Sequence, residues 1–565
     1  MQWRILPKIT ADFIERFPQY PLPILQLLYN REFKTQEQID EFLSPDFEGD
    51  IHDPFLMKGI KEAVVRIIKA ILEQERIIIY GDYDVDGVCS SLILKSTLQK
   101  LGAQSVEIYI PDRHKEGYGL NTKILKEIGK KGPALIITVD CGISNFDEVD
   151  FAQKLGLEII ITDHHQVLEG RLPDAKIIIN PHQEDDNYPF SDLAGAGVAY
   201  KLAQALLIDF KVIDGFDKWL LDLVALATVA DGMPLLGENR TLVKYGLIVL
   251  NKTRRIGLLE LVRQSRLLLP IVNSTDIAFA LAPRLNAAGR MEHANMAFEL
   301  LATESFEEAK FLAERLCQLN SERQVVVDKI IKTIEKKIDL GKKLIFEGDK
   351  KWLIGVLGIV AGKLCDKYRR PTMVFGQAEE GEIKGTGRSF EVFNLVEAMT
   401  NCSDLFLKFG GHPCAAGFSF KEENLEKVRN CLIEQAEKIK DDDLEKFLDI
   451  DLEINSVDFN WQVYDQIKIF APFGRENREP IFLARNLKID ELKMVGNGNK
   501  HLKMNLCFMD LDKKIKTICF NFSQEFDKLK IGDRVDVAFE MIANEWNGFR
   551  ELEMKIIDVK KVIEL

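Results

Sequence analysis

Residues 76–88 read RIIIYGDYDVDGV, an apolar run followed by aspartates at alternate positions. Asp82, Asp84 and Asp86, followed by a glycine, match the start of an EF-hand calcium loop, which needs a bidentate glutamate at its twelfth position. That position is Ile93, and the β-branched run predicts a buried strand where an EF-hand has a helix, so this interpretation fails. An aspartyl-phosphate phosphatase, with Asp84 as nucleophile and Asp86 as acid, remains open at this point.

Length and composition set the class of protein. A chain of 565 residues with 46% hydrophobic residues is too long for one core, so we expect three or four domains. No apolar leader and no run of about 18 apolar residues occurs, which predicts a cytoplasmic protein without membrane contact. The net charge of −14 argues against a surface coated for duplex DNA but leaves room for a local basic channel.

Nine cysteines are scattered through the chain without a C-x-x-C pair. This spacing predicts neither a disulfide framework nor a zinc ribbon. We expect the cysteines to be thiols in or near the core.

A strand followed by polar residues recurs along the first half of the chain. Residues 76–80 lead into GDYDVDG, residues 134–139 lead into DCG at Asp140, and residues 157–162 lead into DHH at Asp163. Helical spacing follows each strand, which predicts a parallel sheet of βαβ units. Ligands bind such sheets outside the carboxyl ends of the strands, so we expect these polar groups to converge.

A fourth acidic point, Asp231, follows the apolar helical run WLLDLVALATVA. An isolated aspartate is more often a helix cap, and Asp163 could simply orient His164, but four points of similar chemistry favour a common site. Crowded carboxylates repel one another unless cations neutralise them. Carboxylates with imidazole and no thiolate suit manganese or magnesium, and two ions sharing a carboxylate suit phosphoester hydrolysis.

These motifs carry a resemblance. GDYDVDG, VDCG, TDHH and VADGMP, in this order, resemble the four motifs of the DHH phosphoesterase superfamily, which excludes the aspartyl-phosphate interpretation. Further motifs narrow the resemblance to the RecJ family of bacterial single-stranded-DNA exonucleases: LAPRLNAAGRM (281–291), GTGRS (385–389), FGGHPCAAGF (409–418) and APFG (471–474).

The resemblance implies site residues. The metal ligands for two Mn²⁺ or Mg²⁺ ions would be Asp84, Asp86, Asp140, His164 and Asp231, with Asp140 bridging. The other catalytic groups would be His165 at the scissile phosphate, Asp163 as its neighbour, and Asp82. Asp82 would complete the first metal site, because Tyr80 stands where many superfamily members carry a histidine.

Substrate contacts are expected in the second half of the chain and around two earlier arginines. A glycine-rich loop lets backbone approach a phosphate, and an arginine offers a bidentate fork. The expected residues are Arg113, Arg284, Asn286, Arg290, Thr386, Arg388, Ser389, Gly410, Gly411 and His412. GAGVAYKLAQAL (195–206) has Tyr200 at the third glycine of a dinucleotide fingerprint, so we interpret it as a packing glycine pair at a helix start.

The expected fold class is α/β with a β-barrel. The segments are residues 1–70, mixed and packed on the catalytic core; 71–305, the parallel-sheet DHH phosphoesterase domain; 306–340, a long connector helix; 341–450, a smaller α/β DHH-associated domain that binds substrate; and 451–565, an OB-fold nucleic-acid-binding domain.

The resemblance implies a metal-dependent exonuclease that degrades single-stranded DNA 5′→3′ in DNA repair and recombination. A helicase and a single-stranded-DNA-binding protein are candidate partners. Two alternatives remain: a DHH phosphodiesterase acting on short oligonucleotides or cyclic dinucleotides, and a catalytically silent nucleic-acid scaffold.

Overall fold

Strands β2 (Ile77–Gly81), β4 (Ala134–Val139) and β5 (Leu157–Thr162) coincide with the three runs predicted as strands. The computed structural model pairs them in a five-stranded parallel sheet of order β3-β2-β4-β5-β6, with β3 (Val106–Tyr109) and β6 (Ile177–Ile179) at the edges. Strands β2 and β4 are buried along their whole length, which is why apolar residues occupy both faces. The predicted parallel sheet is confirmed.

The structure describes residues 1–113, 115–168, 170–379, 381–496, 498–510, 513–520, 522, 528–546 and 549–562. They form two compact units, a large unit of Phe47–Leu444 and a small unit of Met1–Asp46 with Glu445–Leu565. Among the helices of these residues, none is both long enough and apolar enough to cross a membrane.

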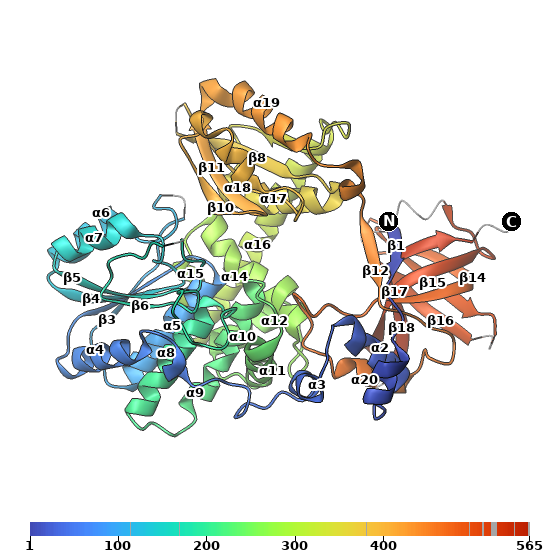
Figure 1. Ribbon diagram of the computed structural model, residues 1–565, viewed down its shortest axis with the longest axis horizontal. Coiled ribbons are helices and arrows are strands. Elements are labelled where there is room, and N and C mark those ends of the chain that lie inside the picture. Colours follow the sequence, from blue (N-terminus) through green and yellow to red (C-terminus); the bar gives the residue numbers. More distant parts are fainter. Residues whose placement is uncertain are drawn as a thin grey trace. The chain divides into compact units, whose positions relative to one another are not determined.

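Helices cover both faces of the parallel sheet (Figure 1). One face packs against α4 (Ile60–Leu72), α5 (Val85–Lys100) and α8 (Gly195–Asp209). The other packs against α6 (Thr122–Lys130) and α7 (Phe146–Lys154). The two layers of side chains leave the carboxyl ends of the strands as the polar edge of the domain.

A helical region follows the sheet and contains α10, the predicted helix before Asp231. Its elements are α9 (Phe216–Trp219), α10 (Leu221–Ala230), α11 (Gly237–Leu250), α12 (Ile256–Gln264), α13 (Ser274–Asp276), the π-helical turn η2 (Ile277–Leu281), α14 (Ala282–Met291) and α15 (Asn295–Ala302). The π-turn ends at Leu281, the first residue of the LAPRLNAAGRM motif, and such turns are frequent at functional sites.

The long helix α16 (Phe306–Glu335) follows and has 30 residues, about 45 Å at 1.5 Å per residue. Val327, Ile330 and Ile334 share a core with α17 (Ile354–Tyr368). A second sheet of order β10-β11-β9-β8-β7 comes next in the large unit. Its strands are β7 (Ile345–Gly348), β8 (Thr372–Glu379), β9 (Glu382–Arg388), β10 (Lys408–His412) and β11 (Ala415–Lys421).

One disulfide corrects the expectation that all cysteines are thiols. Cys402, next to α18 (Leu395–Thr400), is bonded to Cys431 on α19 (Leu425–Ala436). The two residues are 29 positions apart in sequence, so only the packing of α18 near α19 brings them together. The remaining seven cysteines are free.

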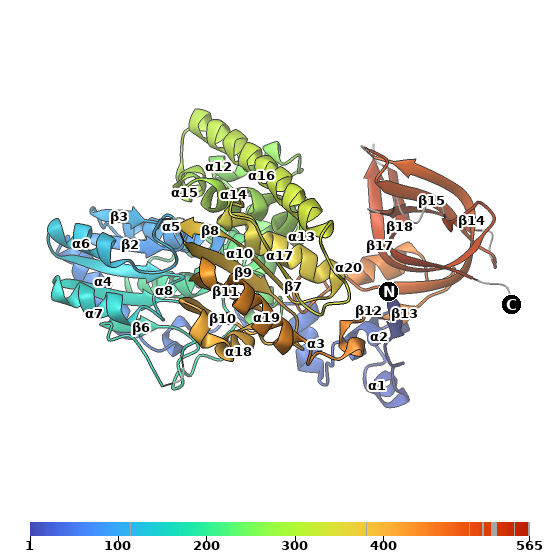
Figure 2. The ribbon, with the colours of Figure 1, turned by 90° about the horizontal axis from the view of Figure 1, so that it is seen from above.

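The small unit contains the predicted barrel. Strand β14 (Phe482–Val495) pairs with both β15 (His501–Phe508) and β17 (Arg534–Trp546), and β16 (Lys513–Cys519) pairs with β18 (Phe549–Lys561). These pairings close a five-stranded barrel, whose curved strands are visible in Figure 2. The short β13 (Leu452–Glu453) pairs in parallel with the start of β14, and α20 (Trp461–Lys468) lies between these two strands in the sequence.

The N-terminal segment differs from expectation. Residues Met1–Asp46 belong to the small unit, whereas residues 1–70 were expected to pack on the catalytic core. Strand β1 (Gln2–Ile5) pairs in parallel with β12 (Phe447–Ile450), and Arg31, after α2 (Leu22–Asn30), donates hydrogen bonds to Asn477 and to the carbonyl of Arg478. Long-range strand pairing, which local sequence does not encode, decides this placement.

Candidate metal centre

The register of the parallel sheet brings the acidic motifs together. Gly81 pairs with Val139, and Val139 pairs with Thr162. The chain therefore leaves three neighbouring strands at the same level, and the polar residues that follow each strand lie side by side. Helix α10 adds Asp231 at its C-terminus.

Three overlapping groups of side chains have ligand atoms within 4.8 Å of one another, namely Asp82, Asp84 and Asp140; Asp86, His164 and Asp231; and Asp140, His164 and His165. His164 is central: its Nε2 lies 3.2 Å from Asp140 Oδ1, 3.7 Å from Asp86 Oδ2 and 3.8 Å from Asp231 Oδ2. The structure thus brings together all the predicted metal ligands, and Asp140 belongs to two of the groups.

Asp84 has a second task as the N-cap of α5. Its Oδ1 accepts hydrogen bonds from the amides of Asp86 and Gly87. These bonds satisfy donors that the first helical turn leaves free, and they also hold the loop that carries the aspartates.

Burial and mutual repulsion make the cluster costly without cations. Burial first, and then repulsion by neighbouring aspartates, raises the pKa of Asp82, Asp86 and Asp140 well above its ordinary value. Asp82 Oδ1 is buried and accepts no hydrogen bond from any residue that the structure describes. A buried acceptor without a donor, beside several carboxylates and an imidazole, fits divalent cations of the Mn²⁺ or Mg²⁺ kind.

Asp140 also has an unusual backbone. Its φ of 60° lies in the left-handed region, which is rare for a residue other than glycine. The residue is buried, and its amide donates to the carbonyl of Thr162 on β5. A strained residue at the centre of a polar cluster is typical of a functional site.

Both carboxylate oxygens of Asp163 accept hydrogen bonds from neighbouring residues. Its Oδ1 accepts hydrogen bonds from the amides of His164 and His165 and from His165 Nδ1, and its Oδ2 accepts from the amide of Ile143. Burial would raise the pKa of Asp163, but the bond from His165 and its positive charge outweigh burial and lower it. The residue is thus an orienting group for the histidine pair.

The two histidines differ in charge. Burial, followed by repulsion from His165, lowers the pKa of His164 to about 4, so its imidazole is neutral and able to bind a metal. Burial would also lower the pKa of His165, but the hydrogen bond and charge of Asp163 raise it to about 9. His165 therefore carries a proton at neutral pH.

Tyr80, at the position of the superfamily histidine, is buried in the sheet. Its hydroxyl donates to the carbonyl of Gly119, and its ring packs against Tyr109. Its hydroxyl therefore bonds the chain rather than completing the cluster, whereas Asp82 lies within a ligand group.

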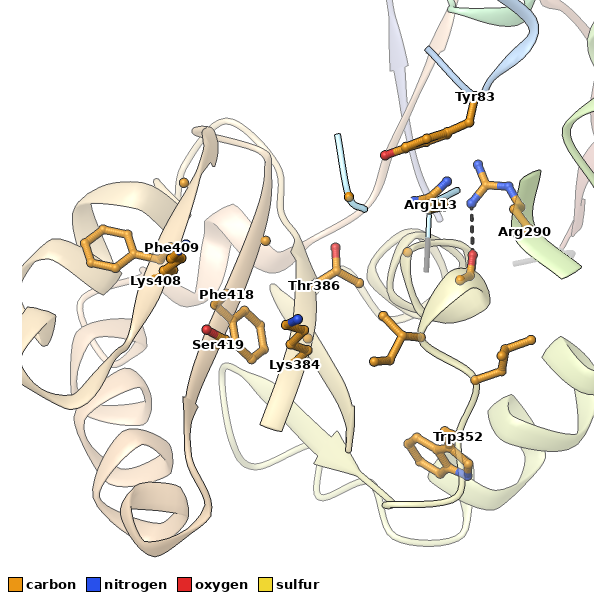
Figure 3. A pocket seen from close by; sticks show the side chains of 18 of the residues that line it. Tyr83, Arg113, Arg290, Trp352, Lys384, Thr386, Lys408, Phe409, Phe418 and Ser419 are labelled. Carbon is orange, nitrogen blue, oxygen red and sulfur yellow. Dashed lines mark hydrogen bonds between the residues drawn. The ribbon is translucent and has the colours of Figure 1, made fainter. Parts of the chain in front are cut away.

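A basic cleft of about 840 Å³ lies between this domain and the second sheet, and Figure 3 shows part of its lining. The cations on its walls are Arg113, Lys115, Arg290, Lys384, Arg388 and Lys408. Among the described lining residues, Glu116 is the acidic one, and its carboxylate already accepts hydrogen bonds from Tyr109 and the amide of Asp112. The wall is thus positively charged although the whole chain is acidic.

Arginine charges concentrate near the catalytic side of this basic cleft. Burial, and then repulsion by Arg113 and Arg323, lowers the pKa of Arg290 to about 10. Its guanidinium donates to the carbonyl of Gly355 (Figure 3). The guanidinium of Arg113 lies 4.9 Å from the centre of the Tyr83 ring. Crowded guanidinium groups of this kind are suited to bind an anion such as a phosphate.

Half of the predicted substrate residues line the basic cleft, namely Arg113, Arg290, Thr386, Arg388 and Gly410. Gly410 lies opposite Gly417, and Gly417 opposite Thr386. A methyl group on either glycine would meet no atom within 4 Å in the described structure, so this row presents bare backbone to the cleft.

The other five predicted residues are absent from the described lining of the cleft, and three of them make internal hydrogen bonds. Asn286 Oδ1 accepts from the amide of Val85, Arg284 donates to the carbonyl of Ala280, and Ser389 donates to that of Phe393. Gly411 packs against Ala415, and His412 is the last residue of β10. Their role as substrate ligands stays a prediction.

Sequence reasoning missed three residues of the site. The hydroxyl of Tyr118 donates to the carbonyl of Asp140 and lies 3.1 Å from His165 Nδ1. The amides of Gly195 and Ala196 donate to Asp86. Two signals pointed to these residues, an aromatic residue between glycines in EGYGLN and the GAG start of a helix.

Comparison with known proteins accounts for most of the chain. The DHH family N-terminal domain matches residues 76–228, the DHHA1 domain matches 341–438, and the RecJ OB domain matches 450–558. The single-stranded-DNA-specific exonuclease RecJ of Bacillus subtilis is 41% identical over 95% of this chain and 67% of its own length. The Haemophilus influenzae protein of the same name is 32% identical over 96% of this chain and 97% of its length.

Solved structures agree with this relationship. The crystal structure of RecJ from Thermus thermophilus with Mn²⁺ has a TM-score of 0.85 and 28% identity, and the match covers 100% of this chain and 80% of that one. A Mg²⁺ complex of the same protein has a TM-score of 0.79 and 27% identity, covering 100% and 79%. The chain belongs to the RecJ family of DHH proteins, because its sequence identity to RecJ proteins, the coverage of the matches and the order of the domains all agree.

Proposed function

We propose that this protein is a metal-dependent exonuclease that hydrolyses phosphodiester bonds of single-stranded DNA. The observation that carries the proposal is a cluster of carboxylates and a neutral imidazole, whose ligand atoms lie within 4.8 Å in each of three overlapping groups. It lies in the same unit as a basic cleft, in a chain of the RecJ family. The cluster supplies cation ligands, and the cleft supplies a path for a polyanion.

The residues that would hold the metal ions are Asp84, Asp86, Asp140, His164 and Asp231, together with Asp82, and Asp140 belongs to two of the three ligand groups. When bound, two such ions supply an activated water and stabilise the leaving oxygen. His165, charged and held by Asp163, would donate a hydrogen bond or a proton at the scissile phosphate. Tyr118 would keep Asp140 and His165 in register.

The basic cleft would hold the strand. Arg113, Arg290 and Arg388 would bind phosphates, and Thr386 would line the same wall. Gly410 has no side chain, so its own backbone could approach a phosphate closely. Arg284, Asn286, Ser389, Gly411 and His412 would make further contacts, as the resemblance of their motifs implies. Gly385 would also shape this wall, since a methyl group there would lie 2.3 Å from the Phe418 ring.

Three finer parts of the proposal rest on the family alone. They are 5′→3′ polarity, a role in DNA repair and recombination in the cytoplasm, and work beside a helicase and a single-stranded-DNA-binding protein. The barrel of the small unit would hold the strand outside the cleft, as OB folds do.

A single assay tests the proposal. The full-length protein is incubated with a long single strand carrying a 5′ label, with Mn²⁺, with Mg²⁺, or with a chelator. Metal-dependent release of labelled mononucleotide from the start of the reaction is the expected result. Activity on short oligonucleotides or cyclic dinucleotides alone, or binding without hydrolysis, would overturn it.

A further inference from the structure

The first turn of α8 is built around a carboxylate from another helix. The amide of Gly195 donates to Asp86 Oδ2 at 2.7 Å, and the amide of Ala196 donates to Asp86 Oδ1, also at 2.7 Å. Within the described structure, the N-cap residue Ala194 makes no side-chain capping bond. Asp86 on α5 therefore caps α8 from outside, and both of its oxygens are fixed at once.

Gly195 is required by space rather than by backbone conformation. It begins an ordinary helical turn and is absent from the glycines with positive φ. A methyl group at Gly195 would lie 2.7 Å from Asp140 Cβ and 2.9 Å from Asp140 Oδ1. Asp140 has little freedom to retreat, because it is buried and its backbone is already in the left-handed region.

We propose that the first turn of α8 is a positioning device for the metal centre, in which the Gly195 and Ala196 amides orient Asp86 and the missing side chain of Gly195 admits Asp140. This inference rests on the proposed metal role of Asp86 and Asp140. Each carboxylate oxygen has two lone pairs, so an oxygen of Asp86 that accepts one amide can still bind a cation. The helix amides also favour negative charge at this point.

Packing gives the device its rigidity. Helices α5 and α8 contribute to one continuous core, with Val88 and Leu92 from α5 and Val198 and Leu202 from α8 all buried. A displacement of α8 would therefore cost apolar contacts, and the amides cannot follow a misplaced Asp86. Groups behind the ligands of metal sites commonly act in this way.

The steric half of the device is tested by Gly195→Ala. Mn²⁺ binding to the chelator-treated full-length protein is measured by isothermal titration calorimetry, without DNA. We expect affinity to fall about 10- to 100-fold, with the metal-induced rise in melting temperature reduced in parallel. Gly197→Ala is the matched control in the same turn, because the atoms nearest to its methyl group would be those of the Leu193 side chain, at 3.2 Å and beyond.

The amide half is tested by Ala196→Pro, which removes one donor to Asp86 at a first-turn position where proline is tolerated. Circular dichroism of the metal-free variants reports whether they fold, and Gly195→Ala decides the matter if the proline variant does not. Wild-type Mn²⁺ affinity in folded Gly195→Ala, or an equal loss in Gly197→Ala, would overturn the inference. If the wild-type protein binds Mn²⁺ but degrades no single-stranded DNA, the proposed function fails and this inference stands.

Discussion

His165 Nδ1 lies 2.8 Å from Asp163 Oδ1, and this hydrogen bond raises the pKa of His165 and lowers that of Asp163. Both carboxylate oxygens of Asp163 accept hydrogen bonds, from His165 and from backbone amides. We therefore predict that Asp163→Asn lowers the rate of hydrolysis about 10²- to 10⁴-fold, the range of general acid–base catalysis, by removing the partner that keeps His165 charged.

Single-turnover hydrolysis and Mn²⁺ titration, run on the same preparations, check this prediction. Metal affinity should stay within about threefold of wild type, and His165→Ala should show a similar rate loss. A large loss of Mn²⁺ affinity in Asp163→Asn would make Asp163 a ligand instead.

The metal ligands give a second prediction. Asp140→Ala and Asp231→Ala should abolish hydrolysis and leave the metal-free fold as stable as wild type or more so, because each removes a charge from a repelling cluster. Asp86→Ala should also abolish hydrolysis but lower stability, because two amides of α8 lose their acceptor. Nuclease assays at saturating Mn²⁺ and urea unfolding without metal measure both effects. Near-normal turnover in any of the three would contradict the assigned cluster.

Recognition of the strand end is a third prediction. Arg388→Ala and Arg113→Ala should weaken use of a 5′-phosphorylated strand more than a 5′-hydroxyl strand, because a charge-assisted phosphate contact contributes about 1.5–3 kcal/mol. The expected loss in kcat/KM is roughly 10- to 150-fold on the phosphorylated strand. Arg284→Ala should have a smaller effect, since its guanidinium bonds a backbone carbonyl.

The control for these arginines is Arg263→Ala, on the surface of α12 and paired with Glu260. It should leave both substrates unaffected. Equal losses on both ends in the Arg388 and Arg113 variants would move these residues away from the terminal phosphate.

The unit boundaries shape a fourth prediction, on strand tracking. A truncated protein of residues 47–444 keeps the whole metal cluster and the basic cleft. It lacks the small unit, which consists of Met1–Asp46 and Glu445–Leu565 and includes the barrel. It should still cleave a dinucleotide. Long strands should bind more weakly, because stacking contributes about 1–3 kcal/mol per base and three lost phosphate contacts would lower the salt slope by roughly two.

Binding of a long oligonucleotide over a salt series, compared with the intact protein after folding has been verified, measures this contribution. Unchanged affinity and slope would leave the barrel as a structural or partner-binding module.

A pair of glutamates in the small unit gives a pH prediction. Burial, and then the hydrogen bond and charge of Glu540, raises the pKa of Glu479 to about 7. The folded state holds a proton that the unfolded state releases near its ordinary pKa of about 4.5. The contribution of this proton to the free energy of unfolding is therefore fully present below about pH 4.5 and is lost as the pH rises to about 7. Glu479→Gln should flatten this decline, as measured by urea unfolding at pH 5 and pH 8. An unchanged difference between the two pH values would refute the shared proton.

Local patterns in the sequence determined a large part of this protein. The β-branched runs before Asp82, Asp140 and Asp163 predicted the central strands. Because the carboxyl ends of parallel strands lie at one edge of a sheet, the polar residues that follow these strands were predicted to meet. The helix that begins at Phe306 was predicted from a long stretch with few helix breakers, although it ends at Glu335 and not near residue 340. Such features depend on neighbours a few positions apart, so the sequence alone displays them.

Tertiary structure decided the rest, because the partners are far apart in the chain. Parallel pairing of Gln2 with Phe447 places the N-terminal segment with the barrel, and the approach of α18 to α19 joins Cys402 to Cys431. The glycine pair at 195–206 was interpreted as packing alone, yet its first amide bonds Asp86, which lies 109 positions earlier. The spacing of residues along a helix or strand does not predict a contact between residues so far apart in the sequence. The contact forms because α8 and α5 bury their apolar faces in the same core.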